Sequence, residues 1–396
     1  MVGPSPNARS RRIVESVTLA IAAKAARMKA EGKDVVSLGA GEPDFPTPEP
    51  IADAGSAAIR SGNYRYTATS GTPELRAAGA RWLKDAFGLD YGPGEIMATA
   101  GAKAGLHMAL SALVEPGDRV LVLAPYWVSY PALIAMAYGE PVILDPVPEA
   151  GFVHEPSAIA RAAEEHSAKG LLLNYPNNPS GAAPGREHLQ QVVDVASELG
   201  LWILSDEIYS TILYDGARHC SPAGLRGGRE RTLVVNGFTK NLTLTGWRIS
   251  FLAGPEPVIE AAGRIQSQVL GNPCTISQQA CLEACRTPLP DEHRRRMESL
   301  DRRRRSLVER INALPGVRAA LPQGAFYVLV DMREHCARLS TSDGRLAERL
   351  LEEHMLATVP GSAFGIPGFL RFSYAAEMSE IEKAADRFAE FVKRIA

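Results

Sequence analysis

The chain has 396 residues, 45% hydrophobic and 22% charged, which is typical of a globular protein large enough for two domains. Its formal net charge of −2 gives no basis for general affinity for nucleic acid or anionic membranes, so an anionic ligand must be bound by a few placed cations. The five cysteines form no C-x-x-C pair and have no zinc-ligand spacing, so we expect no metal site and a reducing, cytoplasmic compartment.

The N-terminal segment begins like a twin-arginine export signal, because Arg11 and Arg12 precede a mildly apolar stretch. However, Glu15 and Lys24 leave only residues 16–23 uncharged, and no small-residue cleavage site follows. We therefore predict an amphipathic surface helix here. No apolar run in the chain approaches the ~20 residues needed to span a bilayer, so no membrane association is expected.

Short apolar, β-branched runs alternate with helical patterns through the middle of the chain. The predicted strands are 95–100, 119–123, 141–144, 170–174, 201–205, 232–236 and 248–253. Helical periods between several of them cover 105–114, 157–168 and 186–199. This alternation is the βαβ signature, so we predict an α/β fold with a mostly parallel sheet and helices on both faces.

After about residue 290 the pattern changes. It predicts a long charged helix at 291–314, strands at 324–332 and 369–375, and a helix at 344–355 between those strands. We therefore expect a large domain over 46–290 and a smaller α+β domain made of 1–45 with 291–396. The arginine run 302–305 is interleaved with acidic residues, which favours a solvated helix face over a nucleic-acid surface.

Residues that composition does not explain follow five of the predicted strands. These segments are 101–105 (GAKAG), 124–130 (APYWVSY), 175–181 (YPNNPSG), 206–209 (DEIY) and 237–241 (GFTKN). Each alone has an ordinary reading, as a helix start, a core tryptophan, a turn or a helix cap. In open α/β sheets, however, ligands bind beyond the carboxyl ends of the strands. We therefore expect the five segments to converge on one crevice.

Together these residues match the needs of a phosphorylated aromatic aldehyde, which requires an amine, a carboxylate for its ring nitrogen, an aromatic face and hydrogen-bond donors. The amine is Lys240, the carboxylate is Asp206 and the aromatic face is Trp127. Asn178 and Tyr209 are the candidate donors to the phenolate. The Ala102 and Lys103 amides after Gly101, together with Arg248, are the candidates for the phosphate. The charged residues nearest to Lys240 in the sequence are arginines. An apolar or cationic setting lets a lysine lose its proton near neutral pH.

At this point the motifs resemble the pyridoxal-phosphate-dependent class I aminotransferases, most closely the bacterial aspartate aminotransferase subgroup that includes prephenate-active enzymes. They are AGEPDF (40–45), YRYTATSGTPELR (64–76), APYWVSYP (124–131), PNNPSG (176–181), SDEIY (205–209), TKNLTLTGWR (239–248) and RFSYA (371–375). The resemblance covers essentially the whole chain. It implies fold type I, pyridoxal 5'-phosphate, amino acids and 2-oxo acids as substrates, and a homodimer with active sites at the subunit interface.

The resemblance also implies a role for each motif residue. Lys240 would bind the cofactor covalently and shuttle the proton, and Asp206 would pair with the ring nitrogen. The other cofactor contacts would be Tyr209 and Asn178 at the phenolate, Trp127 stacked on the ring, Arg248 at the phosphate, and Tyr66 reaching the phosphate from the neighbouring subunit. One departure is Gly237, where the family often has a phosphate-binding serine or threonine.

For the substrate, the resemblance implies that Arg371 grips the α-carboxylate bidentately, helped by Asn178 and the backbone of Gly41, next to Trp127. No mobile arginine clamp is recognisable. Its substitute in the subgroup is the lysine at the glycine-rich helix start, here Lys103, with Thr18 assisting. A second cation indicates dicarboxylic substrates.

The function implied is ping-pong transfer of the amino group from aspartate to 2-oxoglutarate. Prephenate also carries a second carboxylate, so transamination of prephenate or aromatic acids stays open. A carbon–sulfur lyase is a further enzyme class for the same scaffold. A cofactor-sensing transcription regulator is a remote alternative, because only about forty residues precede AGEPDF, too few for a winged helix.

Overall fold

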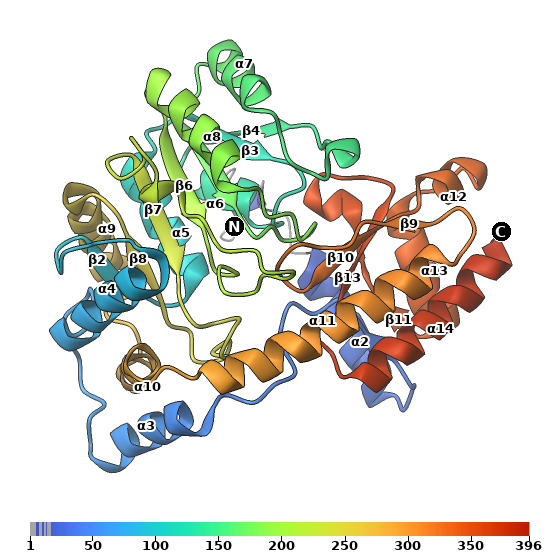
Figure 1. The fold of residues 1–396 in the computed structure, drawn as a ribbon, viewed down its shortest axis with the longest axis horizontal. Coiled ribbons are helices and arrows are strands. Elements are labelled where there is room, and N and C mark those ends of the chain that lie inside the picture. Colours follow the sequence, from blue (N-terminus) through green and yellow to red (C-terminus); the bar gives the residue numbers. More distant parts are fainter. Residues whose placement is uncertain (1–4, 8–9, 12, 14–16, 396) are drawn as a thin grey trace.

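A mixed seven-stranded sheet forms the centre of the larger part of the molecule in the computed structural model, which describes residues 5–7, 10–11, 13 and 17–395 (Figure 1). In spatial order the strands are β2 (Ile96–Thr99), β8 (Ser250–Ala253), β7 (Thr232–Asn236), β6 (Trp202–Asp206), β5 (Gly170–Asn174), β3 (Arg119–Leu123) and β4 (Glu140–Leu144). Only the pairings of β8 are antiparallel within this sheet. The predicted mostly parallel sheet is confirmed.

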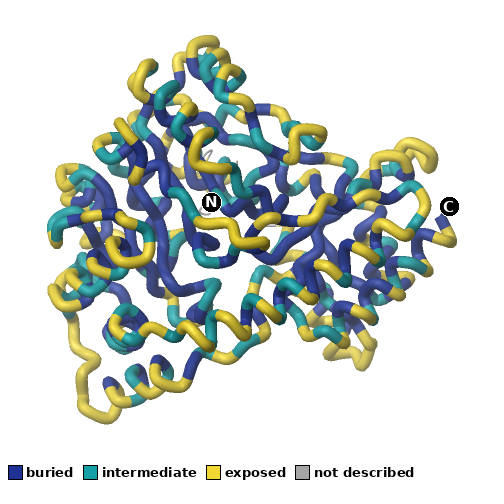
Figure 2. The backbone as a smooth tube through the Cα atoms, in the orientation of Figure 1, coloured by how far each residue is buried: buried dark blue, intermediate teal, exposed yellow. Residues whose placement is uncertain are grey.

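Helices cover both faces of this sheet because alternate strand residues point to opposite sides. On β3, Val120 and Val122 pack in one core with residues of α5, α6 and α9, whereas Leu121 packs in another with residues of α7 and α8. The helices of this part are α3 (Glu49–Arg60), α4 (Pro73–Phe87), α5 (Ala102–Leu113), α6 (Tyr130–Met136), α7 (Pro156–His166), α8 (Arg186–Glu198), α9 (Glu256–Val269) and α10 (Thr275–Arg286). Strands and their carboxyl ends are mostly buried, and the outer helix faces are exposed (Figure 2).

Two smaller sheets contain the rest of the strands. The antiparallel one runs in the order β12 (Val359–Pro360), β13 (Phe369–Ser373), β10 (Tyr327–Asp331) and β9 (Arg318–Ala319), and β1 (Val36–Ser37) pairs in parallel with β11 (Leu356–Ala357). The accompanying helices are α2 (Val17–Ala30), α11 (Pro290–Asn312), α12 (Arg333–Arg338), α13 (Asp343–His354) and α14 (Met378–Ile395). No strand of these sheets lies in 46–290, which supports the predicted domain division. That division itself stays a prediction.

Most predicted elements are present with ends that differ by one to three residues, and the start of β8 has a clear cause. β8 begins at Ser250 rather than at 248, because Arg248 has a left-handed backbone with φ of 52° that cannot continue a strand. The predicted N-terminal helix corresponds to α2, described over Val17–Ala30, while Arg12 and Glu15 lie outside the described residues. No helix in the described part of the chain is long and apolar enough to cross a membrane.

Helix α11, orange in Figure 1, runs from α10 to the antiparallel sheet. Its arginine run is not the solvated face that we expected, because Arg303 and Arg304 are buried. Arg303 donates to both carboxylate oxygens of Asp44 at 2.8 Å, next to the predicted site segment 40–45. The sequence prediction failed because the carboxylates that pair with these arginines include residues distant in the chain, which interleaving along one helix does not show.

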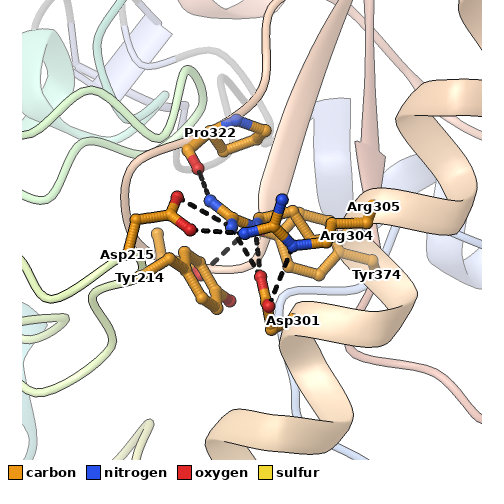
Figure 3. A network of polar contacts seen from close by, with 8 residues as sticks. Tyr214, Asp215, Asp301, Arg304, Arg305, Pro322 and Tyr374 are labelled. Atoms are coloured by element: carbon orange, nitrogen blue, oxygen red, sulfur yellow. Dashed lines mark hydrogen bonds and ion pairs between the residues drawn. The ribbon is translucent and has the colours of Figure 1, made fainter.

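Arg304 is the centre of the polar network in Figure 3. It donates to Asp301 on its own helix at 2.8 Å, to Asp215 at 2.9 Å and to the carbonyl of Pro322 at 2.5 Å. Its guanidinium lies 4.1 Å from the ring centroid of Tyr214. A buried cation with this many partners connects α11 to the chain that follows β6, and it keeps the two parts of the molecule in contact.

We expect Arg304→Ala to lower the free energy of unfolding by about 2 kcal/mol, because it removes a fully buried side chain and leaves the buried carbonyl of Pro322 without its donor. The exposed neighbour Arg302 is the matched control, and Arg302→Ala should change stability by less than about 0.5 kcal/mol. Urea unfolding followed by circular dichroism measures both. Equal losses for the two variants would contradict the importance assigned to this network.

Candidate functional site

A cavity of about 240 Å³ lies at the carboxyl ends of the parallel strands. The predicted site residues that line it are Thr18, Gly41, Ala102, Lys103, Trp127, Asn178, Asp206, Tyr209, Lys240, Arg248 and Arg371. All five segments that the strand-end argument predicted to converge contribute to the lining, together with Thr18, Gly41 and Arg371, which only the resemblance implied. Gly101 lies at the margin of the cavity, against Arg248, and Tyr66 does not line it.

Lys240 follows β7 and is partly buried in the wall of this cavity. Its Nζ donates a hydrogen bond of 2.6 Å to the carbonyl oxygen of Gly41. Burial lowers the pKa of Lys240 to about 8, and the positive charges of Arg371 and Arg248 act in the same direction against Glu42 and Asp206. An amine with such a pKa is partly neutral near physiological pH, so it can act as a nucleophile and as a proton carrier.

Asp206 is the last residue of β6, and its carboxylate faces the same cavity. Burial raises its pKa to about 6, although the Tyr130 hydroxyl donates to Oδ2 at 2.8 Å and the Ile208 amide donates to Oδ1 at 3.3 Å. Lys240 is close enough for its charge to oppose this shift. A buried carboxylate of this kind can hold a protonated ring nitrogen.

Arg371 on β13 supplies a cation from the antiparallel sheet. It donates to Oδ1 of Asn178 at 3.1 Å and to the carbonyl of Gly39 at 2.7 Å, and its guanidinium is stacked between Tyr327, 4.5 Å away, and Phe364, 4.8 Å away. Its Nε is buried without a protein partner. Burial lowers the pKa of Arg371, because a dehydrated cation is less stable than a hydrated one. An anionic ligand beside the guanidinium would offset this loss of hydration.

Tyr209 and Tyr327 share a hydrogen bond of 2.8 Å between their hydroxyl groups. Burial raises the pKa of both. The pair therefore offers a hydroxyl donor at one wall of the cavity and links Tyr209 to the aromatic support of Arg371.

A second cationic region lies at the start of α5. Gly101 has a φ of 85°, and a Cβ there would lie 2.5 Å from Nη2 of Arg248, so glycine is needed for that approach. The first amides of a helix have no intrahelical acceptor and favour anions. Lys103 lies 5.0 Å from the centroid of Trp127, and burial and Arg248 lower its pKa. This end of the cavity suits a phosphate beside a second carboxylate.

Three further predicted features behave differently. Thr18 lines the cavity with a buried hydroxyl that has no protein partner, so it is available to a ligand. At Gly237 a Cβ would lie 3.2 Å from Oγ of Ser250, whereas Thr239, two residues on, does line the cavity. Tyr66 is 98% exposed in the single chain, so its contact with a neighbouring subunit stays a prediction.

Sequence reasoning missed five polar residues of the cavity, namely Ser129, Tyr130, Asn174, Thr239 and Tyr327. Asn174 ends β5, and its amide group donates to the carbonyl of Asp206 at 2.9 Å. It could have been found as the polar end of an apolar strand. Tyr130 lies in the motif that contains Trp127, three residues on. Tyr327 gave no signal, because it occupies an apolar strand far away in the sequence.

Comparison with known proteins agrees with this geometry. The aminotransferase class I and II family model matches residues 33–388. The chain is 41% identical to an aspartate/prephenate aminotransferase of Thermus thermophilus, with 96% of each chain covered, and 38% identical to an aspartate aminotransferase of a Bacillus species, with 97% and 98% covered. Among solved structures it resembles the Thermus thermophilus aspartate aminotransferase with maleate, at a TM-score of 0.92 and 40% identity over 98% of this chain and 100% of that one. It also resembles the Rhizobium meliloti aspartate aminotransferase, at a TM-score of 0.93 and 39% identity over 99% of this chain and 100% of that one.

The lowered pKa of Lys240 predicts unusual amine reactivity in the protein without added cofactor. Competitive acetylation with acetic anhydride, followed by mass spectrometry, should give a midpoint at about pH 8 for Lys240. Exposed Lys169 is the control and is labelled in the same samples. Asp206→Asn should move the Lys240 midpoint lower still, since it removes a negative charge that favours the ammonium form. A Lys240 midpoint equal to that of Lys169 would refute this electrostatic description.

Proposed function

The chain belongs to the class I and II aminotransferases, and we propose that it transfers the amino group of L-aspartate to 2-oxoglutarate with pyridoxal 5'-phosphate as cofactor. The observation that carries this proposal is the single cavity that holds a partly neutral lysine, a buried carboxylate and two separated cationic groups. Several relatives at 37–41% identity are aspartate or aspartate/prephenate aminotransferases, which supports the choice of aspartate.

The residues present fit the cofactor. Lys240 offers the amine, Asp206 lies where a ring nitrogen could be held protonated, and the Tyr209 hydroxyl and Asn178 can donate to a phenolate oxygen. Arg248 beside Gly101 fits a phosphate. When bound, pyridoxal phosphate withdraws electrons from the substrate carbon that bears the amino group.

Substrate orientation follows from the two cations. Arg371 has a free, buried Nε and can bind an α-carboxylate bidentately. Lys103, which lines the same cavity, can bind the second carboxylate of aspartate, glutamate or their oxo acids. Holding both ends fixes the α-hydrogen relative to Lys240, which is the base placed to take it and return it.

The pKa values assign the proton roles. Asp206 is ionised above about pH 6, so its charge is available to the ring nitrogen in the neutral range. Lys240, with a pKa of about 8, can alternate between amine and ammonium at modest cost.

We also propose a homodimer in which Tyr66 completes the phosphate site of the partner. The exposure of Tyr66 and Tyr64, together with Ile59 and the α9 end at Val269 and Leu270, supports an interface here, since large apolar side chains rarely gather at a free surface. The five cysteines are all unpaired, which agrees with a cytoplasmic location.

Prephenate is the second candidate substrate, because several relatives are named aspartate/prephenate aminotransferases and Lys103 suits its second carboxylate equally well. The ratio of kcat/KM for prephenate to kcat/KM for 2-oxoglutarate shows which acceptor is preferred. Release of pyruvate and ammonia without any oxo-acid acceptor would instead indicate a carbon–sulfur lyase.

Purified protein with pyridoxal phosphate should form oxaloacetate from aspartate and 2-oxoglutarate, measured by coupling to malate dehydrogenase. Lys240→Ala should lower kcat by at least about 10⁴-fold and should abolish cofactor labelling by borohydride, because it removes both the nucleophile and the base. The control Lys169→Ala should match the wild type. Absence of oxaloacetate with the wild type would refute the proposed reaction.

Two substitutions should separate the two carboxylate sites. Arg371→Lys should lower kcat/KM for every amino donor by about 100-fold, since a buried bidentate contact is lost. Lys103→Met should raise KM for aspartate by about tenfold. It should leave KM for alanine almost unchanged, because alanine has no second carboxylate. Steady-state kinetics with both donors measures this. Equal effects of Lys103→Met on aspartate and alanine would remove Lys103 from substrate recognition.

A further inference from the structure

A buried acidic group lies directly behind the cavity and takes no part in the contacts described above. Glu207 follows Asp206 in the chain, yet its side chain is fully buried and does not line the cavity. Its Oε1 accepts hydrogen bonds from the hydroxyls of Ser205 at 2.8 Å and Ser221 at 2.6 Å. Its Oε2 lies 2.8 Å from Nε2 of His219.

His219 is as deeply enclosed as its partner. The side chains of His219 and Glu207 are 6% and 0% exposed, and the imidazole packs edge-on against Phe87 at the end of α4, 5.4 Å between ring centroids. A dehydrated carboxylate is costly unless it is paired, and three donors converge on this one. The arrangement therefore has the form of a built ion pair between the end of β6 and the segment 219–221.

The pair matters for the cavity because of its position. Asp206 and Glu207 are consecutive, so two negative charges would lie close together in a medium that screens them poorly. Burial is the largest cause of the raised pKa of Asp206, and the charge of Glu207 raises it further. The charge of Glu207 also raises the pKa values of Tyr91 and Cys220. The charges of Arg229 and Glu95 act on Tyr91 as well, and that of Arg186 acts on Cys220. His219 is the titratable group in direct contact with it.

We propose that Glu207 and His219 form a buried charge pair in which the His219 imidazolium offsets the charge of Glu207 and thereby keeps Asp206 ionised. His219 is thus a positioning residue that acts through Glu207 and touches neither cofactor nor substrate. The inference rests on the proposed function in one respect, namely that an ionised Asp206 is needed to hold the protonated ring nitrogen. If the charge of Glu207 were offset less, the pKa of Asp206 would rise, and Asp206 would become protonated within the pH range in which the enzyme works.

The titration of Asp206 tests this directly in the protein without cofactor. Carbon-13 NMR of aspartate labelled at the carboxyl group follows each midpoint, and the signal missing in Asp206→Asn identifies the residue. His219→Gln keeps a hydrogen-bond donor but can carry no charge. It should raise the Asp206 midpoint by at least about half a pH unit, about threefold in the ionisation constant. Glu207→Gln removes the negative charge and should lower the midpoint.

The double variant and a control sharpen the result. In the Glu207→Gln background, His219→Gln should have no further effect, because the buried imidazole then has no carboxylate to keep it charged. His335→Gln, at a buried histidine on α12, should leave the midpoint unchanged. If His219→Gln gave no shift or a downward one, or if Glu207→Gln gave an upward one, the proposal would be wrong. Simple loosening of the fold would lower the midpoint in both variants, because it would weaken the effect of burial.

Activity gives a second readout. The acid limb of the kcat profile should move to higher pH in His219→Gln and to lower pH in Glu207→Gln, since turnover falls as Asp206 becomes protonated. Glu207→Gln keeps the shape of the side chain and tests the idea alone if His219→Gln fails to fold. A wild type that shows the NMR behaviour but no transamination would refute the proposed function and leave the charge pair intact.

Discussion

The cavity depends on one physical constraint, the burial of an amine and a carboxylate of opposite charge at the end of a parallel sheet. Dehydration disfavours both charges, so it lowers the pKa of Lys240 and raises that of Asp206 toward each other. The two values then bracket neutrality, which is where proton transfer in either direction is least costly. The rest of the site can be understood as what keeps these two groups dry and correctly placed.

Keeping them in place requires both parts of the molecule. The parallel sheet supplies Asp206 and Lys240 from neighbouring strand ends, because β6 and β7 pair side by side. The antiparallel sheet supplies Arg371, whose guanidinium is held flat between two aromatic rings. Helix α11 joins these parts through buried arginines, and Arg303 bonds to Asp44 only three residues from Gly41, the acceptor of the Lys240 amine. A stable fold and a preorganised site therefore share the same contacts.

Much of this could be predicted from the sequence. The strands were visible because buried parallel strands are continuous apolar runs, and Lys240 and Asp206 were visible because polar residues directly after such runs are unusual. Tyr327 was not visible, since an aromatic residue in an apolar strand looks like core until the strand is placed beside Tyr209. The prediction that the arginine run 302–305 faces solvent failed for a related reason, since Arg304 pairs with the distant Asp215. Local patterns report which residues are buried, but the partner of a buried charge is set by tertiary contacts.

The order of the site residues along the chain has a consequence for synthesis. The groups that suit the cofactor, from Gly101 to Arg248, are all complete before α11 begins, whereas Arg371 lies on β13, close to the C-terminus. Domains tend to fold as units while the chain is still being made. Within one chain, the residues proposed to hold the cofactor are therefore synthesised before Arg371, the residue proposed to grip the substrate.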